Sequence, residues 1–434
     1  MSLMRIDDLF HFEKGSLQSS KCTEGDFDFI TASSEWKTHN EYTHDCEALV
    51  FAAAASGSLG RTHYVNGKFI SSDLCFIITP KDPENYPIDL KFYHMIFNEF
   101  KNDIVSSTKA GTSKEAIGMK SFGNYKLPYF DFNKQVGTKN QFVKMQSSKI
   151  DLNSELTHQL DLIKQLRQAF LREAMQGKLC HAELVSASQE TGQQLLEKIK
   201  AEKTQLIAEK KLKKEKELPP ITEDEIPFEI PQHWAWCRLG EICTLITDGK
   251  HGDCKNEPNS GYYFLSAKDI QNGQFIYDGA RQITYDDFLE THRRTNLEPG
   301  DLCIVNTGAT IGKSAFAPED ERTRNTTFQK SVAVVKVIKE YTNMRFVENF
   351  IINETPRLLK KSRGSAINNL LLGDMRNTIF PMPPLQEQEQ IVAKLEELMA
   401  FCDGLEQSIN ESQGYNEMLL QQVLREALQP KEEV

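Results

Sequence analysis

The spacing of apolar residues in the last part of the chain predicts a long helix that packs against another helix. Beyond the prolines of 381–384, two series with a seven-residue step interlock: Ile391, Leu398 and Leu405, and Leu395, Cys402 and Ile409. Two such series form the apolar stripe of a coiled coil rather than that of an ordinary surface helix. Because proline is excluded from a helix interior, we expect this helix to begin just after Pro384.

A second stripe of the same kind lies in the first half of the chain. Leu156, Ile163 and Phe170 are seven residues apart, and Leu166 lies beside them. A helix with such a stripe needs a partner helix to bury it. We therefore expect the two helices to pack on each other, which gives the C-terminal helix a partner within the same chain.

The chain also resembles itself over longer distances, which predicts an internal repeat. Residues 171–178 match 424–431, Leu127-Pro128 falls on Phe380-Pro381, and 111–118 falls on 364–371, each 253 positions apart. Shorter matches upstream have drifting offsets, as loops of unequal length would produce: 29–32 with 264–267, 57–61 with 309–313, and Arg5 with Arg238. The repeat predicts the order domain, helix, domain, helix.

These patterns predict an α+β protein with two strand-rich domains separated by two long antiparallel helices related by a pseudo-twofold axis. Short apolar runs such as 48–52 and 302–305 are typical of buried strands. About forty helical residues would span about 60 Å and act as a rigid spacer. The expected boundaries are 1–140 for the first domain, 141–217 for the central helices, 218–232 for a proline-rich extended linker, 233–384 for the second domain and 385–430 for the last helix.

Composition narrows the class of protein. The chain has a net charge of −11, so it is poorly suited to grip nucleic acid alone, although a basic partner could close around DNA that this chain reads. No run of about 18 apolar residues predicts a membrane span, and the first residues do not resemble a secretory signal. The nine scattered cysteines are typical of reduced thiols, so we expect a cytoplasmic protein.

A search for catalytic patterns gives no convincing set. Gly308 to Ser314 resembles a phosphate-binding loop, but three residues separate its glycines where that loop needs four. We expect instead a tight turn that can present its amides and Lys313, or Arg61 in the first half, to a phosphate. Asp89-Leu-Lys91 is only a weak echo of a nuclease pattern, and no methyltransferase motif or metal-ligand spacing stands out. We therefore predict no catalytic residues and no metal ligands.

Three segments together resemble the specificity subunit of type I restriction–modification systems: 381–399 (PMPPLQEQEQIVAKLEELM), 218–241 (LPPITEDEIPFEIPQHWAWCRLGE) and 192–203 (GQQLLEKIKAEK). The resemblance covers nearly the whole chain and includes the two-repeat layout. It implies a prokaryotic, cytoplasmic, non-catalytic subunit with two target recognition domains similar to the DNA-reading domain of some type II adenine methyltransferases. Each would read half of a split DNA sequence, and the helices would fix the gap and dock two methyltransferase subunits.

The resemblance also implies partners and cofactors outside this chain. The methyltransferase subunits would bring AdoMet, and restriction subunits would bring ATP-driven translocation and cleavage with Mg²⁺. The family supplies no base-reading residues that can be transferred by position. Our candidates for DNA contact are basic residues on predicted loops: Lys37, Arg61, Lys109, Lys114, Lys250, Lys268, Arg293, Arg294, Lys313, Arg324, Lys361 and Arg363. The alternatives are a coiled-coil scaffold that does not read DNA and, on the strength of Gly308 to Ser314, a nuclease or nucleotide hydrolase.

Overall fold

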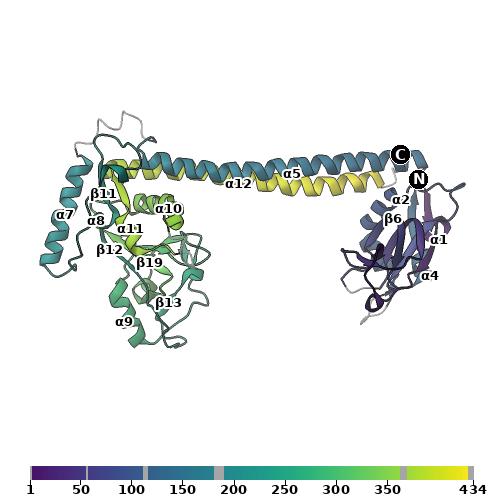
Figure 1. Cartoon of the computed structure of the whole chain (residues 1–434), viewed down its shortest axis with the longest axis horizontal. Helices are drawn as coiled ribbons and strands as arrows, with labels where there is room; N and C mark the ends of the chain where they lie inside the picture. The colour runs from purple at the N-terminus through teal and green to yellow at the C-terminus, as the bar shows by residue number, and fades with distance from the viewer. Residues whose placement is uncertain (1, 55–56, 111–115, 180–189, 362–368, 429–434) are drawn as a thin grey trace. The chain divides into compact units, whose positions relative to one another are not determined.

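The structure is a computed structural model, and it describes residues 2–54, 57–110, 116–179, 190–361 and 369–428. It divides into two compact units: Met1–His158 with Ile409–Val434, and Gln159–Ser408. Each unit contains one strand-rich domain and part of each of two long helices, α5 (Phe132–Met175) and α12 (Leu385–Leu428) (Figure 1). We call residues 2–130 the first domain and residues 235–384 the second domain.

The first domain is built around a six-stranded sheet with the strand order β2-β7-β5-β6-β3-β4. A separate antiparallel pair, β1 with β10, brings the first and last residues of the domain together. Helices α2, α3 and α4 cover the sheet. The elements are β1 (Ser2–Arg5), α1 (Ile6–Leu9), β2 (Phe10–Lys14), η1 (Ser19–Lys21), β3 (Phe27–Ile30), β4 (Lys37–His39), β5 (His44–Ala52), β6 (Thr62–Ser71), β7 (Cys75–Pro80), α2 (Leu90–Glu99), α3 (Lys101–Thr108), β8 (Lys109–Ala110), β9 (Ala116–Ile117), α4 (Met119–Asn124) and β10 (Lys126–Tyr129).

The second domain contains a four-stranded sheet with the order β12-β19-β16-β17 and a joining pair, β11 with β20. Its elements are β11 (Ala235–Arg238), α8 (Leu239–Ile242), β12 (Cys243–Asp248), β13 (Tyr263–Leu265), η3 (Ala267–Asp269), β14 (Ile270–Gln271), β15 (Gln274–Phe275), α9 (Tyr285–Thr295), β16 (Leu302–Val305), β17 (Ser314–Phe316), η4 (Glu321–Asn325), β18 (Thr326–Phe328), β19 (Val332–Val337), α10 (Met344–Lys361), α11 (Leu372–Asn377) and β20 (Ile379–Met382).

The two domains are copies of one scaffold, which confirms the predicted repeat. The sheet order β2-β7-β5-β6 in the first domain corresponds to β12-β19-β16-β17 in the second. Two equivalent glycines fit where no side chain could. A Cβ atom on Gly15 would lie 2.1 Å from the carbonyl oxygen of Ser72, and one on Gly249 would lie 2.0 Å from that of Phe328. In both cases the atoms that a side chain would meet belong to the backbone and cannot easily move. Substitution of either glycine is therefore expected to disturb the fold.

Aromatic packing holds the core of the first domain. Phe122 of α4 is fully buried, and its ring centroid lies 4.6 Å from that of Phe51 and 5.3 Å from those of Phe12 and Phe76. Truncation of such a ring to alanine typically costs about 3–5 kcal/mol of stability. The second domain uses aliphatic residues of β12, β16 and β19 for the same purpose, together with Phe346, Phe350 and Phe380.

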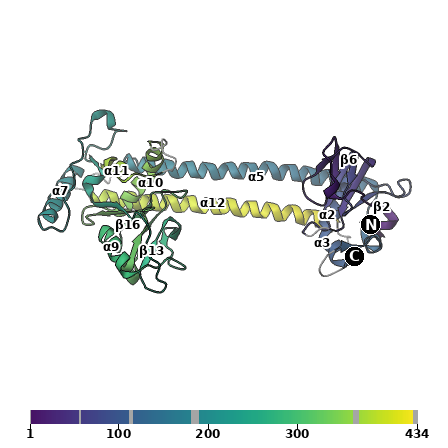
Figure 2. The same ribbon diagram turned by 60° about the horizontal axis from the view of Figure 1, so that its bottom comes forward.

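Helices α5 (Phe132–Met175) and α12 (Leu385–Leu428) each have 44 residues and begin 253 positions apart. Within the second unit they lie side by side and run antiparallel (Figure 2). Arg167 of α5 bonds Asp403 at 2.7 Å and Glu406 at 3.1 Å on α12. α12 begins at Leu385, the first residue after Pro384, whereas α5 begins at Phe132, before the expected boundary of 141, because its first turns pack on the first domain through Gln135 and Phe142.

The predicted stripes differ from the structure in one place. Among the predicted residues, Leu156, Ile163, Ile391, Leu395 and Cys402 are buried, while Leu166, Phe170, Leu398 and Ile409 are half-buried. Leu405 is an exception, because it is exposed. The next residue, Glu406, faces Arg167 instead, and an ion pair replaces the expected apolar contact at this level.

Helix α7 (Gly192–Ala208) docks on the second domain at the start of β11. A capping box between Thr191 and Gln194 begins the helix, and Leu195, Leu196 and Ile199 are buried in the domain core. Lys203 donates to the carbonyl oxygens of Gly240, Glu241 and Cys243 at 2.7–3.0 Å. Burial lowers the pKa of Lys203. Its three hydrogen bonds cap the end of α8.

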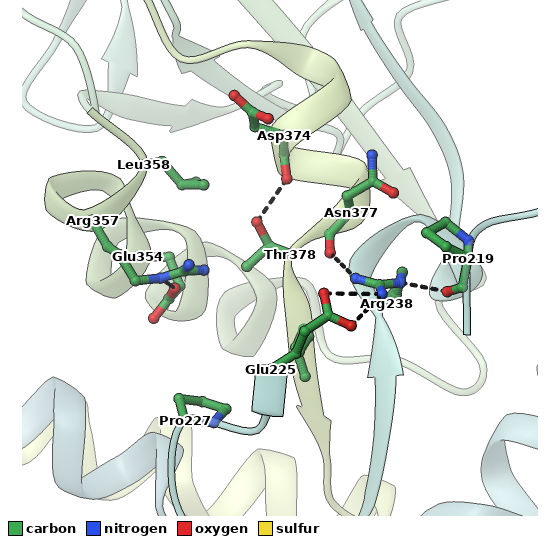
Figure 3. Close-up of a pocket in the computed structure, with 11 residues that line it drawn as sticks. Pro219, Glu225, Pro227, Arg238, Glu354, Arg357, Leu358, Asp374, Asn377 and Thr378 are labelled. Atoms are coloured by element: carbon green, nitrogen blue, oxygen red, sulfur yellow. Dashed lines mark hydrogen bonds and ion pairs between the residues drawn. The ribbon is translucent and has the colours of Figure 1, made fainter. Parts of the chain in front are cut away.

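The proline-rich linker is anchored to the second domain by one buried arginine. Arg238, which is 3% exposed, donates to the carbonyl oxygens of Pro219 and Asn377 and to the carboxylate of Glu225 in η2 (Glu223–Glu225) (Figure 3). It also donates to the carbonyl oxygen of Pro220 at 3.1 Å. The hydrogen bond from Arg238 lowers the pKa of Glu225. The linker expected at 218–232 is therefore a docked strap in this structure.

Candidate nucleic-acid interface

Several loops meet at one end of the sheet of the second domain, which we call the loop end. Strands β12 and β16 end at Asp248 and Val305, and β19 begins at Val332. These three strand ends lie side by side, because Asp248 pairs with Ala333 and Val305 pairs with Val332. Loop 266–269 joins them, since the amide of Ala267 donates to Ser331 Oγ at 3.2 Å. The loop end thus gathers loops 249–253, 266–269, 306–313 and 329–331.

Three exposed lysines lie on three of these loops. Lys268, Lys313 and Lys330 have no ion-pair partner among the residues that the structure describes. Lys268 and Lys313 were predicted from the sequence, whereas Lys330 was missed. Its position just before the buried strand 331–337 would have revealed it if the strand ends had been aligned. Cations on converging loops can contact the phosphates that flank a groove.

Two other predicted residues near the loop end already have partners inside the domain. Lys250 bonds Asp287 at 3.0 Å and Glu290 at 3.1 Å, and these hydrogen bonds raise the pKa of Lys250. Arg294 donates to the carbonyl and carboxylate oxygens of Asp248 at 2.9 and 2.5 Å. Both pairs fix α9 to the end of β12, so these charges serve the fold in this structure.

The remaining predicted cations of the second domain divide into two groups. Arg293 on α9 and Arg324 in η4 are exposed and have no ion pair among the described residues. Lys361 ends α10, but its side chain lies outside the described residues, and so does Arg363. None of these positions is tested as a DNA contact, and each stays a prediction.

The equivalent end of the first domain has different side chains. Lys37 is exposed on the edge strand β4, and Lys109 is exposed on β8, while Lys114 lies outside the described residues. Arg61 is half-buried and donates to the carbonyl oxygen of Ala32 at 3.1 Å and to Ser58 Oγ at 3.3 Å. The predicted cations of this domain are therefore more dispersed and more engaged than those of the second.

An aromatic pair beside β4 adds a candidate that the sequence reasoning missed. Trp36 Nε1 donates to His63 Nδ1 at 3.2 Å, and His63 Nε2 donates to the carbonyl oxygen of Ser33 at 2.9 Å. Burial lowers the pKa of His63, which keeps the imidazole neutral and able to accept from Trp36. Trp36 remains partly exposed. A fixed indole at a loop end can pack against a base or a sugar.

Backbone contacts identify which loop residues correspond in the two domains. The bridge between Leu17 and Ser72 matches the bridge between Lys250 and Gln329. In both cases the following residue, Asp73 or Lys330, donates its amide back to the carbonyl oxygen of Leu17 or Lys250. The loops hence have the same backbone path but opposite charges at 73 and 330.

A cavity of 480 Å³ beside the linker is the other candidate site (Figure 3). Its charged lining is largely paired: Arg238 holds Glu225 at 2.8 Å, and Arg357 holds Glu354 at 2.5 Å. Thr378 Oγ1 donates to the carbonyl oxygen of Asp374. Because these groups satisfy one another and hold the strap, we assign the cavity to linker anchoring.

Six of the described cysteines are buried, while Cys22 and Cys46 are half-buried. Burial raises the pKa of the thiols of Cys75 and Cys243 to about 12, so both are protonated at neutral pH. None of the described helices is long and apolar enough to cross a membrane.

Two copies of one strand-rich scaffold, each joined to a long helix and each with a distinct loop end, define a protein with two recognition domains. A sequence profile described as "Type I restriction modification DNA specificity domain" matches residues 1–169 and 231–412. The chain belongs to this family of type I restriction–modification specificity proteins. The two matched stretches each contain one domain and part of the helix that follows it.

The chain is similar to specificity subunits of type I restriction enzymes from Escherichia coli. It is 29% identical to the EcoAI subunit over 249 residues, which cover 55% of this chain and 40% of that one. It is 26% identical to the EcoEI subunit over 262 residues, which cover 58% and 43%. These alignments span less than half the length of the curated relatives.

Solved structures share the fold. The HsdS subunit from Thermoanaerobacter tengcongensis matches with a TM-score of 0.55 and 14% identity, over 98% of this chain and 96% of that one. A structure from a study of assembly and conformational transition of a type I restriction–modification system matches with a TM-score of 0.53 and 16% identity, over 99% and 97%. These likenesses agree with the α+β class expected from the sequence.

Proposed function

We propose that this chain is the non-catalytic DNA-specificity subunit of a type I restriction–modification complex. Each domain reads one half of a split target in double-stranded DNA, and α5 with α12 sets the separation between the halves. Methyltransferase subunits and restriction subunits bind to the chain and carry out the chemistry. This chain binds no cofactor itself, and AdoMet, ATP and Mg²⁺ belong to the partner subunits.

The observation that carries the proposal is one scaffold with two different loop ends. Ser33 and Asp73 of the first domain correspond to Lys268 and Lys330 of the second, at sequence offsets of 235 and 257. Specificity comes from side chains that meet base edges, whereas contacts to phosphates position the protein. Two readers that share a docking frame but differ in these side chains suit a target made of two different halves.

Apolar residues left exposed on the long helices supply docking surfaces for the methyltransferase subunits. In the first unit, Leu152 and Leu419 are exposed and line a groove of 260 Å³ with Met145. In the second unit, Leu162 and Phe401 are exposed. Exposed apolar side chains that share a groove, as Leu152 and Leu419 do, are typical of protein interfaces. The net charge of −11 supports the same view, because a subunit this acidic needs basic partners to retain DNA at physiological salt.

Methylome sequencing of a host that expresses this chain with its methyltransferase partner tests the proposal. The expected result is adenine methylation at a motif with two defined parts separated by a fixed number of undefined bases. Loss of all methylation at that motif is expected when the chain is omitted. A coiled-coil scaffold that does not read DNA would leave the methylation pattern unchanged by its omission.

A further inference from the structure

Three backbone hydrogen bonds close the hairpin turn between β16 and β17. The amide of Val305 donates to the carbonyl oxygen of Lys313 at 2.8 Å, that of Gly312 donates to Val305 at 2.9 Å, and that of Lys313 donates to Thr310 at 3.2 Å. Gly308 and Gly312 have φ of +104° and +91°, which side chains rarely adopt. The half-buried Ile311 packs against the core of the domain and fixes the turn from below.

The first domain repeats these three hydrogen bonds in a turn that is one residue longer. Its three hydrogen bonds run from Ala52 to Arg61 at 2.8 Å, from Gly60 to Ala52 at 2.8 Å, and from Arg61 to Ser58 at 3.0 Å. Gly60, the counterpart of Gly312, again has a positive φ, of +81°, and Leu59 is buried where Ile311 packs. Even the neighbouring strand is shared, since Ile117 donates to Ala53 as Leu370 donates to Asn306, both at 2.8 Å.

A turn that both domains share is suited to contact a feature that both halves of the DNA target share. The loop-end side chains differ, so they suit two different sequences, but the sugar–phosphate backbone is the same in every half-site. Phosphate contacts fix register and carry no sequence information. The turn with these shared hydrogen bonds is thus placed among the groups that contact the sugar–phosphate backbone. The loop-end side chains that differ are placed among the groups that read bases.

The turn of the second domain presents groups that suit an anion. The amides of Ala309, Thr310 and Ile311 donate to no acceptor among the described residues, and Ala309 is exposed. Consecutive amides with a left-handed glycine form a concave site for anions. The exposed ammonium of Lys313 adds a full charge at the end of this run.

The carboxylate of Glu348, beside the start of β17, does not oppose an anion. Glu348 accepts from Ser314 Oγ at 2.7 Å and is paired with Arg345 at 3.0 Å, so its charge is compensated inside the domain. In the first domain, by contrast, Arg61 is folded onto Ala32 and Ser58. The turn of the second domain is accordingly better suited than that of the first to bind an anion.

We propose that the turn of residues 308–313 binds one phosphodiester group of the DNA backbone, through its amides and Lys313. The turn of residues 57–61 occupies the equivalent place in the first domain. The inference rests on the proposed function, because it assumes that the loop end faces DNA. It adds which element grips the backbone and predicts that this grip is independent of sequence.

The test compares Lys313→Gln with the unaltered chain in the complex reconstituted with its methyltransferase. Affinity is measured against salt concentration for a duplex with the methylated motif and for one with both halves scrambled. We expect Lys313→Gln to weaken both duplexes by the same factor, roughly threefold to tenfold, and to reduce the slope of log K against log salt by about 1. The methylation motif should not change.

Lys339→Gln is the matched control, because Lys339 is an exposed lysine of the same domain that follows the opposite end of β19. It should leave the salt slope unaltered. Ala309→Pro, which removes one amide of the run, should weaken both duplexes as Lys313→Gln does, while Ala309→Ser should not. Co-purification with the methyltransferase and an unchanged melting temperature show that each variant is folded.

An unaltered salt slope for Lys313→Gln would overturn the inference. So would a loss confined to the duplex with the motif, because Lys313 would then read a base. The proposed function fails in a different way: the complex with the unaltered chain would not distinguish the two duplexes at all.

Discussion

Gln135 and Gln388 occupy the same place in the two copies of the repeat, 253 residues apart, and both are completely buried in the first turn of a long helix. Each donates through Nε2 to a carbonyl oxygen five residues earlier, Phe130 at 2.8 Å or Pro383 at 3.0 Å. Each also accepts a hydrogen bond through Oε1, at 2.8 Å, from the amide of the residue just before an earlier helix of its domain. That residue is Asp89 before α2 and Asn343 before α10.

These glutamines should hold each long helix to its domain. Gln388→Ala leaves the carbonyl oxygen of Pro383 and the amide of Asn343 without their side-chain partner. It should therefore destabilise the second domain by about 2–6 kcal/mol, at roughly 1–3 kcal/mol for each orphaned group. Urea unfolding measures the change, and hydrogen exchange should locate it at the amide of Asn343. Gln386→Ala is the control, since Gln386 is exposed on the same turn. Equal stability of the two variants would refute the anchoring role.

The docking of α7 should depend on Gly192. A Cβ atom at this position would lie 2.0 Å from the carbonyl oxygen of Met382 and 2.8 Å from the amide nitrogen of Ala235. Gly192→Ala should therefore displace the helix, with a loss of roughly 3 kcal/mol or more. Limited proteolysis of the linker at 210–230 measures the displacement. Gly373→Ala, where no atom lies within 4 Å, should have a small effect. Unchanged proteolysis of Gly192→Ala would rule out close docking.

The exposed ring of Phe401 on α12 should contribute to the methyltransferase interface. Phe401→Ser removes an exposed apolar group, so we expect at least a tenfold weaker association with the methyltransferase and no loss of stability in the isolated chain. Titration of labelled methyltransferase measures the affinity. Glu396→Gln, at another exposed position of the same helix, is the control. If Phe401→Ser binds as tightly as the unaltered chain, this part of the helix lies outside the interface.

The stability of the first domain should fall in mildly acidic solution. Burial lowers the pKa of His94 and of His63 below the ordinary value of 6.5. Below pH 6.5 the unfolded chain therefore binds protons that the folded domain does not, and the free energy of unfolding decreases as the pH falls through this range towards the lowered values. Well above pH 6.5, where the histidines are neutral in both states, these two groups contribute no pH dependence.

His94→Gln separates this effect from general acid denaturation. His94 Nε2 donates to the carbonyl oxygen of Thr62 at 2.9 Å, and a glutamine can supply the same donor without a titrating group. Urea unfolding at pH 7.5 and 5.5 should show a smaller loss of stability for His94→Gln than for the unaltered chain. The same pH dependence in both proteins would show that His94 does not titrate as we infer.

Much of this architecture could be predicted from the sequence, because periodicity and repeats are local signals. The helix after Pro384 begins where proline chemistry requires it, and the matches at a constant offset mark equivalent elements of the two domains. Leu405 was predicted at the helix interface but is exposed, since Arg167 draws Glu406 into its place. A sequence pattern does not reveal such a choice between neighbouring positions.

The candidate interface was less predictable. Charge alone cannot distinguish Lys250, which Asp287 and Glu290 hold, from Lys313, which has no such partner among the described residues. Those carboxylates are 37 and 40 residues away in sequence and reach Lys250 only through the packing of α9. The shared turn was found as a weak sequence match at 57–61 and 309–313, and its hydrogen bonds became visible only in three dimensions.

The most direct test of two readers on a helical spacer inserts one heptad into both α5 and α12 at facing positions, followed by methylome sequencing with the partner methyltransferase. Seven residues add about 10 Å of helix, which corresponds to roughly three base pairs. We predict that both halves of the methylated motif stay the same while the undefined gap between them lengthens by about three base pairs. A motif with an unchanged gap, or with altered halves, would contradict the proposal.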